Sequence, residues 1–146
     1  MARHTITLSP LPADIDELDH VSNLVYVRWI LEVALSHSAA LGWDHAAYRH
    51  LGAVFVVRRH EIDYLASVVL GDDVEVTTWV ESWKQVSCVR KTELVRVRDR
   101  AVVARASTTW AFIDYAGKPR RIPAELLTLF TNEPGSIAAT PVTLGR

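Results

Sequence analysis

The sequence predicts an α+β fold in which one long, curved antiparallel sheet wraps around a central helix. Three observations support this prediction: an apolar helical segment near the N-terminus, four long segments rich in Val, Thr and Trp after it, and short turns containing Gly or Asp between those segments. A helix that is apolar around most of its circumference must be covered on several sides, and a rolled sheet is the simplest cover. Such a sheet has open edges, so we expect a homodimer at least.

The bulk composition is that of a single globular domain. The chain has 146 residues, 49% of them hydrophobic, which suffices for one domain with its own core. The net charge of −1 argues against binding to nucleic acid or to an anionic membrane surface. Cys88 is the only cysteine, which fits a reducing compartment, and the first twenty residues lack the features of a secretory signal. We expect one cytoplasmic domain over residues 1–146, with an irregular tail from about residue 131 and no segment inserted in a membrane.

The helical part can be placed by its start and stop signals. Residues 3–8 alternate in hydropathy and predict a short first strand. The central helix is expected from about Ser22 to Leu41, because either Ser22 or Asp19 can cap its first turn. A second short helix is expected over Asp44–Leu51.

Four β segments follow the helices. In the second segment, alternate residues are apolar on one face, which is typical of a half-buried strand. Because the turns are short, we expect these segments to form an antiparallel meander. Trp79, Trp83 and Trp110 are placed on the second face of the sheet, where a partner subunit would cover them, and Pro123 is expected to open a last helical turn. The segments are Ala53–Leu65, Asp73–Gln85, Val86–Arg98 and Ala101–Asp114.

Ionisable side chains lie in the stretch DIDELDHVSN, directly before the apolar helix. The amino end of a helix carries about half a positive charge and several unpaired N–H groups, so it can hold the oxyanion that forms when a thioester or ester carbonyl is attacked. Asp16 is close enough to fold back over this end and to act as nucleophile or general base, while His20 can orient it or protonate a leaving group. The same residues can also serve only as helix caps, and the pattern alone leaves both interpretations open.

The pattern D-x-D-x-x-x-H-V-x-N-x-x-Y-x-x-W, which begins at Asp14 and is followed by Glu32, resembles the signature of hotdog-fold acyl thioesterases. It is similar to the 4-hydroxybenzoyl-CoA thioesterase-like group, close to the acyl-carrier-protein branch with its D-x-x-x-H-V-N-N-x-x-Y run. The sequence DYL with a later GD, and the sequence GKPRRIP from Gly117, resemble later family segments. The resemblance covers residues 6 to 130.

The resemblance implies a hotdog fold and assigns roles to three residues. The catalytic carboxylate falls on Asp16, the oxyanion-binding backbone N–H falls at Asn23, and His20 falls on a histidine proposed to assist in the carrier-protein branch. Leu18 stands where the plant enzymes of that branch have asparagine, so their polar constellation is not reproduced in full. A further family acid falls near Asp63 or Glu61, where a solvated strand face is the simpler interpretation.

The resemblance also places the site at a subunit interface, with the pantetheine arm between protomers. Tyr26 of the signature is taken as a substrate-binding residue. Surface cations are candidates to contact the nucleotide phosphates, or the acidic helix of a carrier protein, although each is also an ordinary solvated strand charge. These cations are Arg58, Arg59, Arg90 and Lys91.

The function expected from these residues is hydrolysis of an acyl-CoA or acyl-carrier-protein thioester to free acid and thiol. Two alternatives stay open: an acyl-thioester hydratase and a non-catalytic acyl-CoA-binding or regulatory module. We expect no cofactor and no metal, since one cysteine excludes thiolate zinc sites and Tyr64 stands where a zinc-protease motif needs its second histidine. The resemblance further implies a tetramer made of two dimers.

Overall fold

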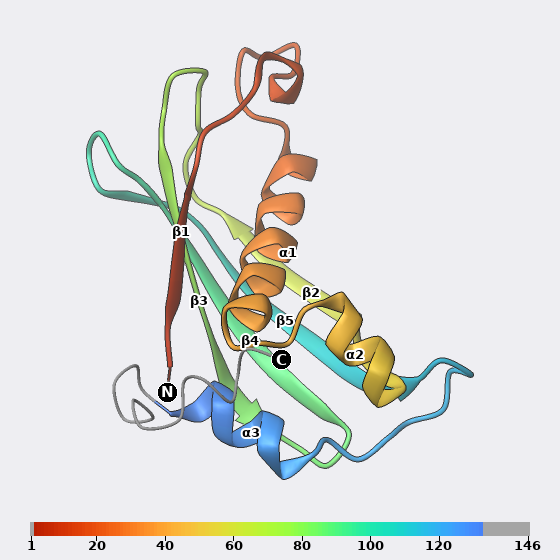
Figure 1. The fold of residues 1–146 in the computed structure, drawn as a ribbon. Coiled ribbons are helices and arrows are strands. Elements are labelled where there is room, and N and C mark those ends of the chain that lie inside the picture. The colour runs from red at the N-terminus through yellow and green to blue at the C-terminus, as the bar shows by residue number, and fades with distance from the viewer. Residues whose placement is uncertain (1, 133–146) are drawn as a thin grey trace.

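The computed structural model describes residues 2–132, which form one antiparallel sheet with a long helix lying across one of its faces (Figure 1). The predicted α+β architecture, a sheet around a central helix, is therefore confirmed. The elements in chain order are β1 (His4–Leu8), a 3₁₀ turn (Pro12–Asp14), α1 (Asn23–Ala40), α2 (His45–Leu51), β2 (Ala53–Tyr64), β3 (Val74–Trp83), β4 (Ser87–Arg96), β5 (Ala101–Asp114) and α3 (Ala124–Thr131). The predicted tail from about residue 131 lies almost entirely outside the described residues.

The strand order is β1-β3-β4-β5-β2, and every neighbouring pair is antiparallel. The prediction of a simple meander over the four long strands was wrong, because only β3, β4 and β5 follow one another and β2 pairs with β5. The reason lies in α1: β1 precedes the helical part and β2 follows it, so the chain crosses the sheet along the helix and continues on the opposite edge (Figure 1). Both of these strands are edge strands in the single chain.

Helix α1 begins where the sequence signals placed it. The Ser22 hydroxyl oxygen accepts a hydrogen bond from the Leu24 N–H at 3.3 Å, which makes Ser22 the cap. Ile30 and Val33 are fully buried against the sheet. Leu35 on the opposite side of the helix remains 67% exposed, so the sheet covers α1 on one side only within the single chain.

Two β-bulges change which side chains face α1. One bulge in β3 lies between Val80 and Ser82, and one in β2 lies between Val57 and Arg59. An extra residue in one strand reverses the alternation beyond it, and the β3 bulge turns Trp83 toward the helix side. Trp83 therefore packs in the core cluster at the carboxyl end of α1.

The expectation that three tryptophans occupy the second face of the sheet holds only for Trp79. The guanidinium of Arg3 lies over the Trp79 ring at 3.9 Å, on the face away from α1. Trp83 and Trp110 instead line a cavity on the helix side. Trp110 belongs to the same set of alternating residues as the buried Phe112 and Thr108, so its position follows from the pleat of β5.

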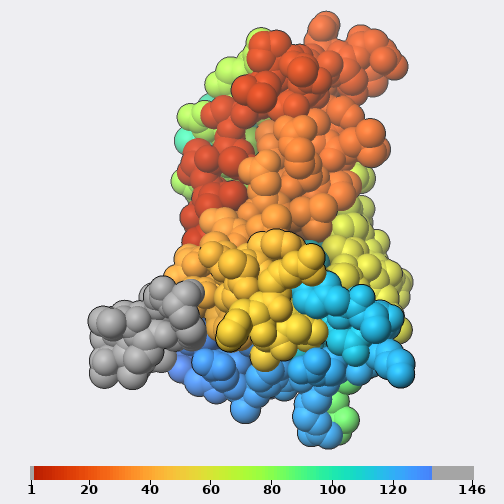
Figure 2. All heavy atoms as spheres, turned by 45° about the vertical axis from the view of Figure 1, so that its right-hand side comes forward, coloured from red at the N-terminus to blue at the C-terminus, as the bar shows by residue number. Residues whose placement is uncertain are grey.

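Helices α2 and α3 close the end of the molecule near the carboxyl end of α1 (Figure 1). Figure 2 shows α2 (yellow) packed against the turn that follows β5 (light blue), where the Arg49 guanidinium lies 4.7 Å from the Tyr115 ring centroid. Within residues 2–132 no single helix is long and apolar enough to cross a membrane, and only α1 and α2 taken together, as a pair bent by 69°, have the length and composition to do so.

Candidate active site at the amino end of the central helix

Residues 15–21 form a tight turn directly before α1. A bridge between Ile15 and Val21 closes it, and inside it the Asp16 N–H donates to the His20 carbonyl at 2.8 Å. Asp19 takes a left-handed backbone conformation with φ of 63°, which Asp tolerates better than most residues. The Val21 N–H donates to the Val68 carbonyl at 2.8 Å, so the turn is anchored to the loop between β2 and β3.

The two aspartates of this stretch have different surroundings. Asp14 is 5% exposed, and both of its oxygens are engaged: one accepts from the Leu11 N–H and the other from Arg28, each at 2.9 Å. The hydrogen bond from Leu11 lowers the pKa of Asp14, burial works against it, and Arg28 lowers it further. Asp14 is thus an ionised structural residue that holds the turn to α1.

Asp16 has free hydrogen-bonding capacity. Its Oδ1 accepts from the Leu18 N–H at 2.9 Å, while Oδ2 has no hydrogen-bond partner among the described residues. The side chain is half-buried, whereas the neighbouring Glu17 and Asp19 are exposed. Of the two aspartates, the one that the family resemblance marks is the one left available for chemistry.

The first turn of α1 offers a backbone donor. The Ser22 side chain takes the Leu24 N–H, and the Ser22 carbonyl takes the Val25 N–H at 2.9 Å. The N–H of Asn23 has no partner among the described residues, and the helix dipole makes this end positive. The Asn23 carbonyl accepts from the Tyr64 hydroxyl at 3.3 Å, which ties the end of β2 to the helix start.

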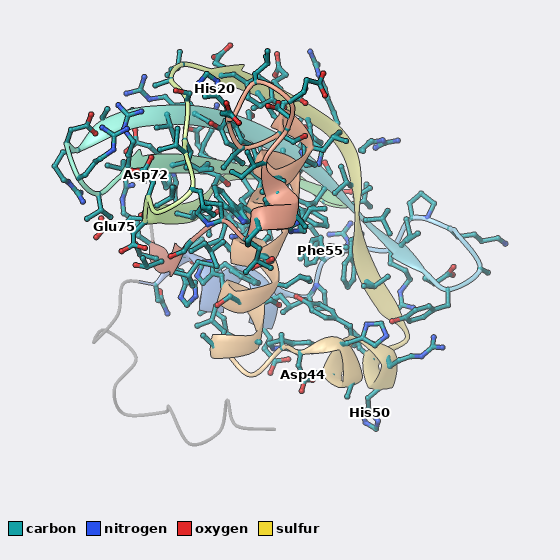
Figure 3. All side chains as sticks on the ribbon, turned by 90° about the horizontal axis from the view of Figure 1, so that it is seen from above. His20, Asp44, His50, Phe55, Asp72 and Glu75 are labelled. Atoms are coloured by element: carbon teal, nitrogen blue, oxygen red, sulfur yellow. The ribbon has the colours of Figure 1, made fainter. Side chains whose placement is uncertain are left out.

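His20 lies in the turn above the amino end of α1, as the view down this end shows (Figure 3). Its side chain is exposed, and within residues 2–132 its imidazole makes no hydrogen bond, to Asp16 or to any other group. The structure therefore brings its backbone, but not its ring, into contact with Asp16.

Tyr26 is part of the core. It is 3% exposed, its hydroxyl donates to the Ala66 carbonyl at 3.1 Å, and its ring stacks on that of Tyr64 at 5.3 Å. Burial raises the pKa of Tyr26, so the phenol stays protonated and keeps this hydrogen bond. These contacts position α1 against β2, and a role for Tyr26 in binding substrate stays a prediction.

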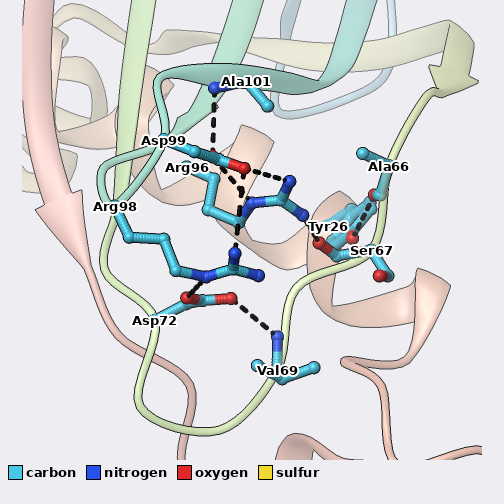
Figure 4. Close-up of polar contacts among 9 residues, drawn as sticks. All are labelled: Tyr26, Ala66, Ser67, Val69, Asp72, Arg96, Arg98, Asp99 and Ala101. Carbon is cyan, nitrogen blue, oxygen red and sulfur yellow. Dashed lines mark hydrogen bonds and ion pairs between the residues drawn. The ribbon is translucent and has the colours of Figure 1, made fainter.

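A polar clamp that the sequence analysis missed fixes the loop between β2 and β3 (Figure 4). Arg96 pairs with Asp99 at 2.7 Å and donates to the Ser67 carbonyl, while Arg98 pairs with Asp72 at 2.6 Å. Burial by itself raises the pKa of Asp72, but hydrogen bonds from Arg98 and from the Val69 N–H outweigh it and lower the pKa. The clamp holds the loop whose Val68 carbonyl anchors the turn of residues 15–21. The Gly71-Asp72 turn was the only sequence signal for it.

The four predicted cations occupy different environments. Arg58 and Arg59 are exposed at the β2 bulge, and Arg59 pairs with Glu61 at 3.3 Å. Lys91 faces away from α1 and pairs with Glu81 at 3.7 Å. Arg90 is only 6% exposed, so the expectation that it lies on the surface was wrong.

The burial of Arg90 follows from the sheet register. It pairs with Val80 on one side and Thr108 on the other, both buried on the helix side of the sheet. Its Nη1 donates to His37 Nδ1 at 3.0 Å and to Thr78 Oγ1 at 3.1 Å. Burial, followed by the nearby Arg90 charge, lowers the pKa of His37 to about 3, so the ring is neutral and can accept this hydrogen bond.

The sheet, the crossing helix and a free carboxylate beside the helix start define a hotdog-fold protein. The family model described as "Thioesterase-like superfamily" matches residues 10–130, and the chain belongs to this superfamily. No match was found among curated protein sequences.

Solved structures agree with this class. A 1,4-dihydroxy-2-naphthoyl-CoA thioesterase from Synechocystis is 17% identical over 90% of this chain and 97% of that chain, with a TM-score of 0.82. A DHNA-CoA thioesterase from Staphylococcus aureus is 20% identical over 98% of this chain and 95% of its own, with a TM-score of 0.81. A thioesterase from Thermus thermophilus, solved with coenzyme A and Zn, is 21% identical over 86% of this chain and 90% of its own, with a TM-score of 0.75. At these identities the likeness establishes the hotdog fold.

Proposed function

We propose that the protein hydrolyses an acyl-CoA thioester, with Asp16 as the catalytic carboxylate and the Asn23 N–H as oxyanion donor. The observation that supports this most strongly is the contrast between the two aspartates. Both oxygens of Asp14 accept hydrogen bonds, from Leu11 and Arg28, whereas Asp16, in the turn directly before α1, has one oxygen without a partner among the described residues. Membership of the thioesterase-like superfamily supports the reaction class.

The chemistry needs few groups. The Asp16 carboxylate takes a proton from water as the water oxygen bonds to the carbonyl carbon, or it attacks that carbon itself and the resulting anhydride is hydrolysed. The carbonyl oxygen becomes an oxyanion at the Asn23 N–H and the helix dipole. The C–S bond then breaks, and the thiolate leaves with the electron pair and takes a proton from solvent. His20, which is exposed, is an alternative donor of this proton to the thiolate.

A homodimer formed through β2 completes the site. No strand among residues 2–132 pairs with the outer edge of β2, on which Val56 and Val57 are 36% and 37% exposed. Antiparallel pairing of two β2 edges about a twofold axis places the Tyr64 end of one strand beside the Phe55 region of the other. The Tyr64 hydroxyl donates a hydrogen bond to the Asn23 carbonyl, so this pairing would place the amino end of each α1 beside the Phe55 region of the partner subunit.

Coenzyme A is the thiol carrier we propose. Two similar structures, from Thermus thermophilus and from Staphylococcus aureus, are described as complexes with coenzyme A. Arg58 is the cation best suited to the nucleotide phosphates, since it is exposed near the middle of the proposed interface and forms no ion pair among the described residues. Arg59 and Lys91 are already paired with Glu61 and Glu81.

The test is the Asp16→Asn variant, assayed by thiol release from a panel of short, long and aromatic acyl-CoAs. Asparagine keeps the oxygen that accepts from Leu18, so the turn should fold, while kcat/KM should fall by at least about a hundredfold. Glu17→Gln is the matched control, because it removes an exposed neighbouring charge and should change little. Full turnover by Asp16→Asn would exclude this role, and acyl-CoA binding without turnover in the natural protein would favour the non-catalytic module.

A further inference from the structure

The carboxyl end of α1 contains a cavity that the amino-end chemistry does not use. Its volume is about 270 Å³, and its walls come from α1, α2, α3 and strands β2 to β5. Most of the lining is apolar. The residues that matter below are Phe55, Trp83, Cys88, Arg90, Trp110 and Phe130.

Arg90 is a buried cation that forms no ion pair within residues 2–132. Its Nη1 donates to His37 and Thr78, and its guanidinium lies 5.4 Å from the Phe130 ring centroid, so these three contacts are all with neutral groups. Burial lowers the pKa of Arg90 to about 10, which still leaves it charged at neutral pH. An isolated buried charge is costly unless an ion of opposite sign joins it.

The free part of the guanidinium has the geometry of a carboxylate receptor. The two N–H groups on Nη1 are taken by His37 and Thr78. Nε and Nη2 have no hydrogen-bond partner within residues 2–132, and together they form the side edge to which a carboxylate binds through two parallel hydrogen bonds. The acid that lines the same cavity, Asp44, is exposed and caps α2 through the Ala47 N–H at 2.9 Å; it forms no ion pair with Arg90.

Two tryptophans in the wall of the same cavity also carry unpaired hydrogen-bond donors. The indole N–H groups of Trp83 and Trp110 are buried and donate to no described atom. Buried polar groups in native proteins nearly always have a partner, so each unsatisfied donor indicates an acceptor that the described residues do not supply. The free edge of the Arg90 guanidinium at this mostly apolar cavity therefore calls for a ligand with acceptor oxygens on an apolar body.

We propose that this cavity binds the far end of the acyl group and that Arg90 recognises a carboxylate there. The protein would then act on half-thioesters of small dicarboxylic acids. The cavity volume of about 270 Å³ is several times the roughly 30 Å³ that one water occupies in the liquid, so a short acyl group such as adipoyl is of a suitable size. This inference rests on the proposed thioesterase function.

The position of the cavity agrees with such a role across the dimer. Eleven residues separate Asn23 from Ala34, the first cavity residue of α1, which is about 16 Å at 1.5 Å per residue. A six-carbon acyl group is too short to join the two ends of one helix. Phe55 lies between β2 and α1 (Figure 3) and lines the cavity, so the β2 pairing described above brings the partner's Asn23 to its entrance.

The experiment compares adipoyl-CoA with hexanoyl-CoA, which has the same chain length but no terminal carboxylate. The natural protein should prefer adipoyl-CoA in kcat/KM by at least about tenfold, because a site built for an acceptor rejects the analogue that lacks it. Arg90→Met should abolish or invert this preference while keeping a long side chain in place. Arg90→Lys, which keeps the charge but loses the two-pronged edge, should give an intermediate ratio. Arg105→Met, on the opposite face of the sheet, is the control and should leave the ratio unchanged.

A binding readout separates this inference from the proposed function. Trp83 and Trp110 in the cavity wall should report adipate binding by a change in tryptophan fluorescence, lost in Arg90→Met. Hydrolysis of both thioesters with a ratio that Arg90→Met leaves unchanged overturns the role of Arg90 and leaves the thioesterase proposal standing. Hydrolysis of neither thioester, with adipate binding that depends on Arg90, overturns the thioesterase proposal and keeps the anion site. Absence of adipate binding to the folded natural protein overturns the anion site.

Discussion

The two ends of α1 use charge in opposite ways. At the amino end, the segment before α1 carries two acids; one of them, Asp14, pairs with Arg28, and the other, Asp16, has a free oxygen. At the carboxyl end, Arg90 is buried, its hydrogen-bond partners His37 and Thr78 are neutral, and no acid in the described part of the chain pairs with it. The comparison suggests that one end supplies an attacking group and the other a receptor. Since the two ends of one helix lie too far apart for a small acyl group, they can cooperate only across a dimer.

The largest expected effect comes from separating the subunits. Val56→Lys places a cation on the exposed edge strand β2 within the proposed interface, and a lysine on an edge strand opposes its pairing with another strand. We expect a monomer at micromolar concentration. Turnover should fall by at least about a hundredfold, because the amino end of each α1 then no longer faces the cavity of a partner subunit. Sedimentation velocity and thiol release, measured over the same concentration range, check this.

The matched control for that experiment is Thr7→Lys on β1, the other edge strand, which should leave both the assembly and the turnover unchanged. A Val56→Lys monomer that retains full kcat/KM would show that each chain carries a complete site, and the comparison between the two helix ends would fail.

A second prediction distinguishes the two aspartates by stability. Asp14→Ala removes the acceptor of the Leu11 N–H and of Arg28, and the free energy of unfolding should fall by about 2–3 kcal/mol. Arg28 is half-exposed and regains water when its partner is lost, which keeps the loss below that of a fully buried pair. Asp16→Asn should leave the urea midpoint nearly unchanged. Equal losses in the two variants would mean that Asp16 is structural as well.

Much of the framework was predictable from residue patterns, whereas pairing and environment were less so. The central helix and a cap at Ser22 or Asp19 follow from local signals; the structure confirms the helix and shows that Ser22 is the cap. The partner of β2 depends on how the chain crosses the sheet, and no local pattern encodes that. The bulge that turns Trp83 toward α1 also could not be predicted from the sequence. One extra residue reverses which face of the sheet the following side chains occupy, and no distinctive residue type marks its position.

The burial of Arg90 could have been inferred from the sequence. Cys88, Thr92 and Leu94 have the same parity along β4, and all three are buried with Arg90 on the helix side. An apolar set on one face of a strand marks that face as the inner one, so an arginine within the set should have been placed in the core. The different hydrogen bonding of Asp14 and Asp16 could not be predicted from residue alternation. It depends on the 3₁₀ turn, which directs the Asp14 carboxylate toward the Leu11 N–H.

The smallest expected effect concerns the pH dependence of stability at the carboxyl end of α1. His37 is buried, stacks on His4 at 5.2 Å and has a pKa lowered to about 3 by burial, the Arg90 charge and His4. At a pH below the ordinary pKa of histidine, 6.5, the His37 imidazole binds a proton in the unfolded chain but stays neutral in the folded chain. Stability from this group is therefore complete above about pH 6.5 and is lost as the pH falls, by about 2 kcal/mol between pH 7.5 and 5.

His37→Asn isolates this contribution, because the amide oxygen can still accept from Arg90 but does not titrate. His4 and His60, whose pKa values burial also lowers, are present in both proteins and cancel in the comparison. Asp14 and Asp72, at the amino end, stay ionised above pH 5 in the folded and unfolded states alike, so their effect appears only at lower pH. Urea unfolding at pH 7.5 and pH 5 should thus show a smaller loss for His37→Asn than for the natural protein. Equal losses would mean that the His37 imidazole is hydrated and titrates freely. Water would then also reach the neighbouring Arg90, and the argument that Arg90 is a desolvated cation in need of an anion would fail.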